Sequence, residues 1–315
     1  MAVTSRGPDV VYVLRALGLG DLLTAVPALR ALRGHFDGRV VLAVPASLGA
    51  LALHTGAVDA VVPTTGLGDV RAIGRRPTVA VNLHGRGPQS VDHLKALQPR
   101  TLLTHRHPLH PDIEGPVWDG AAHEVDRWCG LLRWAGIDAH PDELALPRPA
   151  GYPDGSGVVV VHPGAAAPAR RWPVERFGVV AAALSAHGHR VVVTGSASET
   201  AIAHGVASWA GLPESAVLAG KLDVLGMVAL MHDARLLVCG DTGVAHIATA
   251  TGTPSVLIFG PTAPSMWGPR RADRHVVLWA GGSGDPHAAE PDAGLLAIDP
   301  GVVVDCCRNL LRECA

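Results

Sequence analysis

Residues 10–44 of the 315-residue chain read VVYVLRALGLGDLLTAVPALRALRGHFDGRVVLAV, and this stretch decides the fold. A short run of apolar, largely β-branched residues (Val10–Leu14) is followed by a glycine-rich turn, a leucine- and alanine-rich segment (Leu22–Leu32) and a second short apolar run (Arg39–Val44). Short apolar runs are typical of buried parallel strands, and the longer segment between them is typical of a helix. The sequence therefore predicts a strand–helix–strand unit in this region.

The same alternation of short apolar runs and longer helical segments continues along the chain. Such alternation predicts mostly parallel sheets covered by helices on both faces. We expect further strands at Ala57–Val62, Thr78–Asn82, Val158–His162, Arg190–Thr194, Leu236–Val238 and Ser255–Phe259. We expect further helices at Ser47–Thr55, Glu124–Ala135, Val174–Ala186, Glu199–Ala210, Val224–His232 and Val302–Arg312. Residues 103–118, rich in histidine and proline, interrupt the pattern.

A stretch without periodicity divides the chain near its middle. Residues 146–157 read LPRPAGYPDGSG, and such a run of proline, glycine and polar residues is typical of a linker. The sequence therefore predicts two Rossmann-like, doubly wound α/β domains, residues 1–150 and 151–300, followed by a helix within residues 301–315. In enzymes built this way we expect the ligand site in the cleft between the domains.

The composition argues against several classes of protein. Hydrophobic residues make up 48% of the chain and charged residues 17%, which is too apolar for a disordered protein. A net charge of −2 without a basic stripe argues against nucleic-acid binding. We find no apolar run near the roughly 18 residues that cross a membrane, and no pattern of a secretory signal. We therefore expect a soluble cytoplasmic protein with no nucleic-acid partner and no membrane anchor.

Cysteine and lysine usage adds two expectations. Five cysteines without CxxC spacing favour reduced thiols (Cys129, Cys239, Cys306, Cys307 and Cys314). Of the 26 basic residues only Lys95 and Lys221 are lysine, a bias typical of a GC-rich genome. An arginine where a related protein has lysine can therefore reflect this bias, although the two residues bind anions differently.

The first chemical motif is the turn GLGD (residues 18–21), which follows the first strand. A glycine-rich turn at the carboxyl end of a parallel strand is where α/β sheets bind ligands. The dinucleotide fingerprint would need glycine in place of Leu23 and an acidic residue after the second strand, so NAD binding is not favoured. Asp21 is then either a carboxylate at the ligand site or the N-cap of the helix. Pro27 implies that this helix is kinked or begins after Asp21.

Two later motifs suit a diphosphate. The loop HPGAA (residues 162–166) leaves a strand and precedes Arg170 and Arg171, a combination of backbone N–H groups and guanidinium charge that binds phosphate. The alternative, an exposed surface turn, fits less well beside Pro168 and Trp172. The segment GDTGVAHIA (residues 240–248) opens a helix whose first N–H groups form an anion site. Its alternative is an ordinary helix capped by Asp241 or Thr242, with His246 in the core.

Two smaller signals leave alternatives open. Glu199 is placed either to accept a hydrogen bond from a ribose hydroxyl or to interact with a helix dipole. His105, His107 and His110 suggest a metal site, but their loop has no cysteine and no second HxxxH pattern. We expect an exposed or substrate-lining loop there, and no metal.

Taken together, four segments resemble glycosyltransferase family 9, the family of ADP-heptose–lipopolysaccharide heptosyltransferases. They are VLRALGLGDLLTAVPALRAL (13–32), HPGAAAPARRWPVERF (162–177), TGSASE (194–199) and LAGKLDVLGMVALMHDARLLVCGDTGVAHIATATGTPSVLIFGPT (218–262). The resemblance covers Val10 to Pro269. It implies a GT-B fold, with the acceptor site in the N-terminal domain and the nucleotide-sugar donor site in the C-terminal domain. It also implies a last helix that crosses back to the first domain.

By this resemblance Asp21 matches the proposed general base of the family, Arg170 stands where the family usually has a phosphate-binding lysine, and Glu199 matches the acid that contacts the donor ribose. The implied donor site comprises Gly164, Ala165, Arg170, Arg171, Glu199, Lys221, Leu222, Asp241, Thr242, Gly243 and His246. The implied acceptor site comprises Gly20, Asp21, His84, His107 and Asp112. No metal and no cofactor besides the nucleotide sugar is expected. The chain departs from the family at Ala165–Ala167, where relatives have hydroxyl residues.

The resemblance implies an inverting, metal-independent glycosyltransferase that moves a sugar, expected to be heptose, from an ADP-sugar donor to a hydroxyl group. The lack of a polybasic patch and the GC-rich bias favour a soluble acceptor, such as an aminoglycoside or another natural-product precursor in antibiotic biosynthesis. Asp112, Glu114 and Asp119 would meet a cationic acceptor of this kind. The alternatives are a lipopolysaccharide-type heptosyltransferase, a nucleotide-sugar epimerase on the same scaffold, and an inactive sugar-nucleotide-binding protein. The sequence leaves the oligomeric state open.

Overall fold

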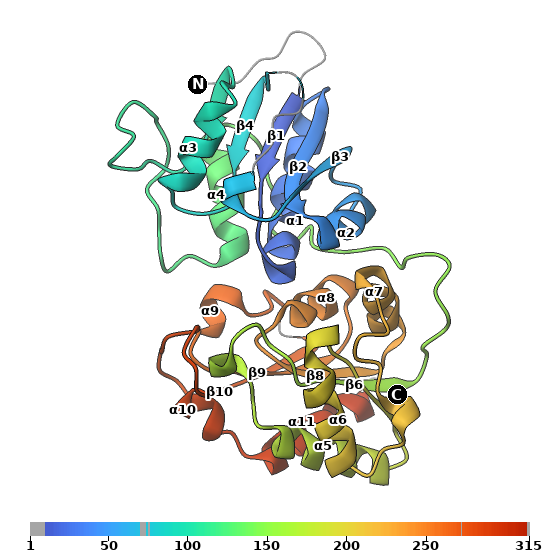
Figure 1. Cartoon of the computed structure of the whole chain (residues 1–315). Helices are drawn as coiled ribbons and strands as arrows, with labels where there is room; N and C mark the ends of the chain where they lie inside the picture. The colour runs from blue at the N-terminus through green and yellow to red at the C-terminus, as the bar shows by residue number, and fades with distance from the viewer. Residues whose placement is uncertain (1–9, 70–73, 75, 272, 314–315) are drawn as a thin grey trace. The chain divides into compact units, whose positions relative to one another are not determined.

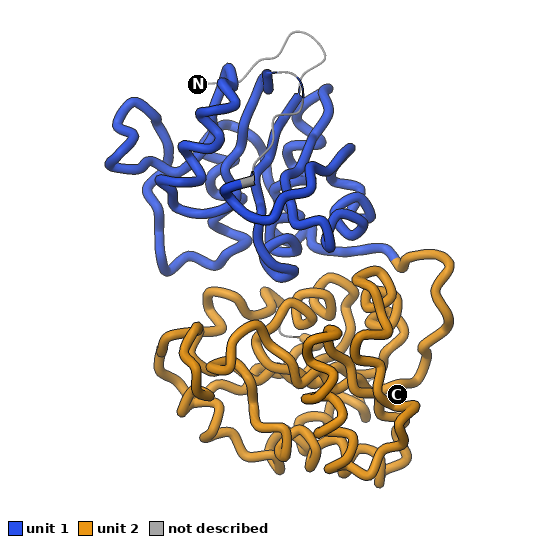
Figure 2. Tube along the Cα trace, viewed as in Figure 1, with its two compact units in different colours: residues 1–147 blue, residues 148–315 orange. Residues whose placement is uncertain are grey.

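The computed structural model describes residues 10–69, 74, 76–271 and 273–313 (Figure 1). The chain divides into two compact units, Met1–Pro147 and Arg148–Ala315 (Figure 2). The division falls inside the stretch that the sequence predicts as a linker. Each unit contains a five-stranded sheet with helices between successive strands. The prediction of a two-domain α/β protein is confirmed.

Unit 1 orders its strands β3-β2-β1-β4-β5, and all of them run parallel. The strands are β1 (Val10–Leu14), β2 (Arg39–Pro45), β3 (Ala60–Thr64), β4 (Val79–Asn82) and β5 (Thr101–Leu103). The helices are α1 (Leu19–His35), α2 (Gly49–His54), α3 (Gln89–Ala96) and α4 (Glu124–Trp134), with 3-10 turns at Ala46–Leu48 and Leu67–Asp69. The strand order reverses between β1 and β4, and α/β sheets bind ligands beyond the carboxyl ends of strands at such a point.

Unit 2 orders its strands β10-β9-β8-β6-β7, again all parallel. The strands are β6 (Val158–His162), β7 (Arg190–Val193), β8 (Leu236–Gly240), β9 (Ser255–Phe259) and β10 (His275–Trp279). The helices are α5 (Val174–Ala186), α6 (Thr200–Trp209), α7 (Val224–Asp233), α8 (Gly243–Thr251), α9 (Pro264–Trp267), α10 (Ala293–Leu296) and α11 (Pro300–Glu313). Short 3-10 turns lie at Pro168–Arg170, Ala197–Glu199 and Glu214–Ala216. Here the order reverses between β6 and β8.

The strands β6, β8 and β9 of the unit 2 sheet are buried on both faces, which explains their continuous apolar sequence. Val159 and Val161 of β6 join the core that α5, α6 and α11 cover. Val160, which points to the opposite face because strand side chains alternate, is also fully buried. On that side α7 packs against α8, and α8 contacts β8 and β9.

The last helix, α11, packs within unit 2. Its buried side chains belong to the unit 2 core and include Val303, Cys307 and Leu311. The family resemblance led us to expect a helix that crosses back to the first domain. Because its apolar face is buried against α5, β8 and β9, we assign α11 to unit 2 instead. Cys314 lies outside the described residues, and the other four cysteines are free thiols.

The structure differs from the sequence expectations in two further ways. The sequence did not predict β5, β10, α3, α9 or α10. Helix α1 begins at Leu19 and contains Pro27, so the alternative of a start after Asp21 is wrong. The proline removes one backbone hydrogen bond, and the burial of Leu22–Leu29 holds the helix against the sheet. Within the described ranges no helix combines the length and the apolar character needed to cross a membrane.

Candidate active site

The loop after β1 brings a buried arginine beside Asp21. Arg15 directly follows β1, and only 1% of its surface is exposed. Its guanidinium lies 3.0 Å from the Asp21 carboxylate, and its Nε donates to the Asp21 carbonyl oxygen (2.9 Å). Arg15 also donates to the carbonyl of Leu83, which follows β4. It therefore joins the two loops that flank the reversal point of unit 1.

Asp21 is the third residue of α1, and its carboxylate turns back to the start of the helix. The N–H of Gly18, which caps the helix, donates to Asp21 Oδ2 (3.2 Å). The alternative of Asp21 as the N-cap is therefore wrong. The Asp21 side chain is 27% exposed, so a ligand can reach it. Burial raises the pKa of Asp21 above its ordinary value, the Arg15 charge opposes that rise, and the Glu124 charge adds to it.

Glu124, the first residue of α4, is the second partner of Arg15. Its Oε1 accepts from Arg15 Nη2 (2.8 Å) and from Trp128 Nε1 (3.0 Å), and its Oε2 accepts from Arg127 Nε (3.0 Å). Burial raises the pKa of Glu124, but Arg15 and Arg127 outweigh it and hold that pKa below its ordinary value. We did not predict Arg15 or Glu124 as site residues. For Arg15 the available signal was its position, a charged side chain directly after five apolar strand residues.

The structure brings only part of the predicted acceptor set together. Gly20 precedes Asp21 in α1, and His84 lies two residues after β4, where its Nδ1 accepts the N–H of Ala16 (3.2 Å). Burial, together with the charges of Arg15 and His93, lowers the pKa of His84 to about 4, so the ring is neutral at pH 7. His107 and Asp112 belong to the loop of residues 104–118. Asp112 is exposed there and pairs with Lys95 (3.3 Å).

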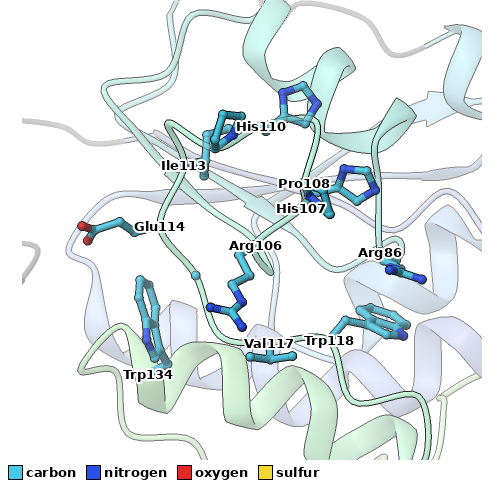
Figure 3. Close-up of a pocket in the computed structure, with 12 residues that line it drawn as sticks. Arg86, Arg106, His107, Pro108, His110, Ile113, Glu114, Val117, Trp118 and Trp134 are labelled. Atoms are coloured by element: carbon cyan, nitrogen blue, oxygen red, sulfur yellow. The ribbon is translucent and has the colours of Figure 1, made fainter.

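This loop lines a cavity of about 670 Å³ in unit 1 (Figure 3). The cavity is lined by two aromatic side chains, Trp118 and Trp134. Its lining also includes two basic residues, Arg86 and Arg106, and one acidic residue, Glu114. His107 also lines the cavity, whereas Asp112 does not. The two limbs of the loop lie close together, because the N–H of Arg106 donates to the carbonyl of Pro116 (3.1 Å).

The three histidines of the loop do not gather around one point. His105 is 3% exposed and packs edge-on against Trp118 and Trp128, with ring centroids 5.0 and 5.8 Å away. His107 and His110 instead line the cavity. Among the residues that the structure describes, no group of three or more His, Cys, Asp or Glu side chains is arranged to hold a metal ion.

In unit 2, Gly164 and Glu199 meet beyond the ends of β6 and β7. A Cβ at position 164 would lie 2.2 Å from Glu199 Oε1, so any other residue there would displace this carboxylate. Glu199 Oε2 accepts from both the N–H and the hydroxyl of Ser196 (2.8 Å each). Burial raises the pKa of Glu199, but these hydrogen bonds, together with the nearby Arg171 charge, bring that pKa below its ordinary value.

Arg170 and Asp241 face each other across the reversal point of unit 2. Asp241 follows β8, is 6% exposed, and its Oδ2 lies 4.0 Å from Arg170 Nη1. Burial raises the pKa of Asp241 to about 6, although Arg170 opposes the rise. Arg170 Nε is buried and has no hydrogen-bond partner among the described residues. A buried guanidinium N–H without a partner is suited to an anionic ligand.

The remaining predicted donor residues lie in neighbouring loops. Arg171 Nε donates to the carbonyl of Ala165 (2.8 Å), so it holds the glycine–alanine loop in shape. Thr242 is the N-cap of α8, Gly243 is its first residue, and the ring of His246 lies edge-on to Trp267 at 5.9 Å. Lys221 Nζ donates to the carbonyl of Val217 (2.7 Å), and Leu222 lies half-buried next to it.

The chain is similar in sequence to proteins of one family. The model for glycosyltransferase family 9 (heptosyltransferase) matches residues 130–291, slightly more than half of the chain. Lipopolysaccharide heptosyltransferase 3 of Escherichia coli is 33% identical over 129 residues, which is 40% of this chain and only 38% of that protein's length.

Solved structures show the same fold over nearly the whole chain. A family 9 glycosyl transferase from Veillonella parvula has a TM-score of 0.78 at 19% identity and covers 97% of both chains. Escherichia coli ADP-heptose lps heptosyltransferase II has a TM-score of 0.75 at 20% identity, covering 96% of this chain and 98% of that one. With the family pattern in the sequence and the fold found in both units, the chain belongs to glycosyltransferase family 9.

Proposed function

We propose that this protein transfers a sugar, with heptose the expected one, from an ADP-linked donor to an acceptor hydroxyl, with inversion at the anomeric carbon. The observation that carries the proposal is the Asp21 carboxylate, which is partly exposed and held in a fixed direction at the reversal point of unit 1. Asp21 takes the proton of the acceptor hydroxyl as that oxygen bonds to the sugar. The bond between the sugar and the diphosphate breaks, and its electron pair leaves with ADP.

The donor half of the proposal rests on unit 2. The leaving ADP gains negative charge, which Arg170 and the N–H groups at the start of α8 stabilise without a metal ion. Glu199 accepts a hydrogen bond from the ribose, and backbone N–H groups of the loop after β6 replace the hydroxyls lost at Ala165–Ala167. The name of the structural relative, ADP-heptose lps heptosyltransferase II, supports ADP-heptose as the donor. Activity that survives a metal chelator is expected.

The acceptor half rests on the cavity of unit 1. Its volume suits a small molecule, and Trp118 and Trp134 offer surfaces on which a sugar ring can pack. The lining has two arginines and one glutamate, and this excess of positive charge favours an acceptor with a carboxylate or phosphate group over a cationic aminoglycoside. Asp112 is already paired with Lys95, which further weakens the case for a cationic ligand. We retain a soluble natural-product precursor as the acceptor, now with an acidic group.

A lipopolysaccharide-type acceptor is the second candidate. Two exposed apolar side chains line the cavity, Val117 (61% exposed) and Trp134 (47%), and Leu109 (70%) belongs to the loop of residues 104–118. Such apolar surface suits an acceptor with a lipid part. A panel of acidic saccharides and lipopolysaccharide core fragments, each incubated with ADP-heptose, distinguishes the two. Consumption of ADP-heptose without any acceptor would favour the epimerase alternative.

Replacing Asp21 by asparagine tests the base directly. Asp21→Asn keeps the shape but cannot take the proton, so the turnover number falls about 10²- to 10⁴-fold while the affinity for ADP stays unchanged. Turnover is followed by ADP release, and affinity by calorimetry. Asp37→Asn, at an exposed position of the same unit, is the control and retains full turnover. Equal loss of turnover and ADP affinity in Asp21→Asn would show a structural role.

A further inference from the structure

We propose that Arg15 and Glu124 are positioning residues, which fix the direction of the Asp21 carboxylate and adjust how readily it takes a proton. The inference rests on the proposed function, because Asp21 is the proposed base. It concerns two residues to which the sequence motifs assign no role: Arg15 lies in segment 13–32 but before the GLGD turn, and Glu124 lies outside all four family-like segments. They contribute through the contacts that they make with Asp21 and with each other.

Both oxygens of the Asp21 carboxylate are fixed. Oδ1 lies 3.0 Å from Arg15 Nη2, and Oδ2 accepts the N–H of Gly18 at 3.2 Å. Each oxygen of an ionised carboxylate can accept a second hydrogen bond. The 27% of the side chain that stays exposed therefore presents free acceptor positions in one defined direction. A base held in this way does not have to be ordered again when the acceptor binds.

Arg15 can fix Asp21 because it is itself held on every side. Its guanidinium donates to the carbonyls of Asp21 and Leu83 and to Glu124, and it lies over the Trp128 ring at 4.9 Å. Hydrogen bonds in these several directions require the planar guanidinium group of arginine, since the ammonium group of lysine is a single compact charge. The charge is retained in Arg15→Lys, but the geometry is lost.

Glu124 matters because it shares the Arg15 charge with Asp21. The cluster holds two cations, Arg15 and Arg127, and two anions, Glu124 and Asp21. Of the other groups around Asp21, the Gly18 N–H donates to it, and His84 beyond Arg15 is neutral at pH 7. The two residues therefore act on Asp21 with opposite sign: Arg15 favours the ionised carboxylate, and Glu124 disfavours it.

Opposite signs give a test that a purely structural role would not pass. Glu124→Gln keeps an oxygen for Arg15 but loses the charge, so the pKa of Asp21 falls by about one unit; Arg15→Met raises it by about one unit. The pKa is read from the carboxyl ¹³C shift in protein labelled at aspartate, with the signal assigned by its loss in Asp21→Asn. Arg33→Met is the control. Arg33 is an exposed arginine of α1, the helix that carries Asp21, and it pairs with Asp59 at 3.3 Å, so its loss leaves the Asp21 pKa unchanged.

The rate of sugar transfer provides a second test of the proposal. The acidic limb of the pH profile of kcat/KM moves with the measured pKa, to lower pH in Glu124→Gln and to higher pH in Arg15→Met. Arg15→Lys keeps the limb in place, lowers kcat about 10- to 100-fold and leaves KM for the donor unchanged.

Each outcome decides a separate point. If Arg15→Met does not fold, the Glu124→Gln arm still decides, because an unchanged or raised Asp21 pKa in that variant overturns the inference. Shifts in the same direction in both variants also overturn it. Opposite shifts support the network. If they occur while Asp21→Asn retains full turnover, the network stands and the proposed base is wrong.

Discussion

Asp241 is the acidic side chain of the predicted donor site that is buried most deeply, with 9% of its side chain exposed and Arg170 no closer than 4.0 Å. Its pKa of about 6 in the folded protein lies above the ordinary value of 3.8. The folded state therefore keeps a proton that the unfolded chain has released at the same pH. The contribution of Asp241 to stability is therefore full below pH 4, decreases as the pH rises from about 4 to 6, and then stays constant.

We predict that Asp241→Asn stabilises the protein at pH 7.5 and has little effect near pH 4. The gain at pH 7.5 is on the order of 3 kcal/mol at most, since each unit of pKa difference corresponds to about 1.4 kcal/mol. Thermal unfolding of both proteins across this pH range measures it. Asp37→Asn serves as a control for the exchange of carboxylate for amide. A stability difference that is the same at both pH values would contradict the burial argument.

At the level of elements, the loop of residues 104–118 shapes the proposed acceptor cavity, and its form depends on Gly115. A Cβ at this position would lie 2.0 Å from the Thr104 carbonyl oxygen, and a backbone atom cannot move aside as a side-chain tip can. The two limbs of the loop thus approach as closely as they do only because residue 115 has no side chain.

We predict that Gly115→Ala lowers the free energy of unfolding by about 1–3 kcal/mol and abolishes transfer, while ADP binding to unit 2 is retained. Gly120→Ala is the matched control, because nothing lies within 4 Å of a Cβ there. Its stability should be unchanged or raised by up to about 1 kcal/mol. Urea unfolding and ADP titration of both variants measure the two effects. Wild-type transfer by Gly115→Ala would show that the loop does not bind the acceptor.

The sequence was informative for elements that are long or apolar throughout. β1, β6 and β9 were predicted with the bounds that the structure has, because each is a run of buried residues set off by turns. β5 has only three residues, too few for a pattern. β10 lies beside β9 at the edge of its sheet and stays half exposed, so His275–Trp279 lacks the continuous burial that marks the central strands.

At the scale of the whole molecule, the missing information was contact between distant segments. Arg15 and Glu124 are 109 residues apart in the sequence, and no local pattern links them. The same holds for Gly164 and Glu199, which looked like parts of two separate motifs. The division at Pro147 could be predicted, since the linker has its own composition. The assignment of α11 could not, because its apolar face fits either sheet until the packing is known.

The whole proposed mechanism depends on the binding of an ADP-linked sugar to unit 2, and calorimetric titration with ADP, UDP, GDP and NAD measures that binding. We predict that ADP binds most tightly and that Arg170→Ala weakens it about 10- to 100-fold, the loss expected for a charged hydrogen bond to phosphate. Arg190→Ala, at an exposed position of the same unit, should bind ADP as the wild type does. Preference for UDP or GDP would exclude ADP-heptose as the donor, and binding of NAD alone would contradict the proposed glycosyl transfer.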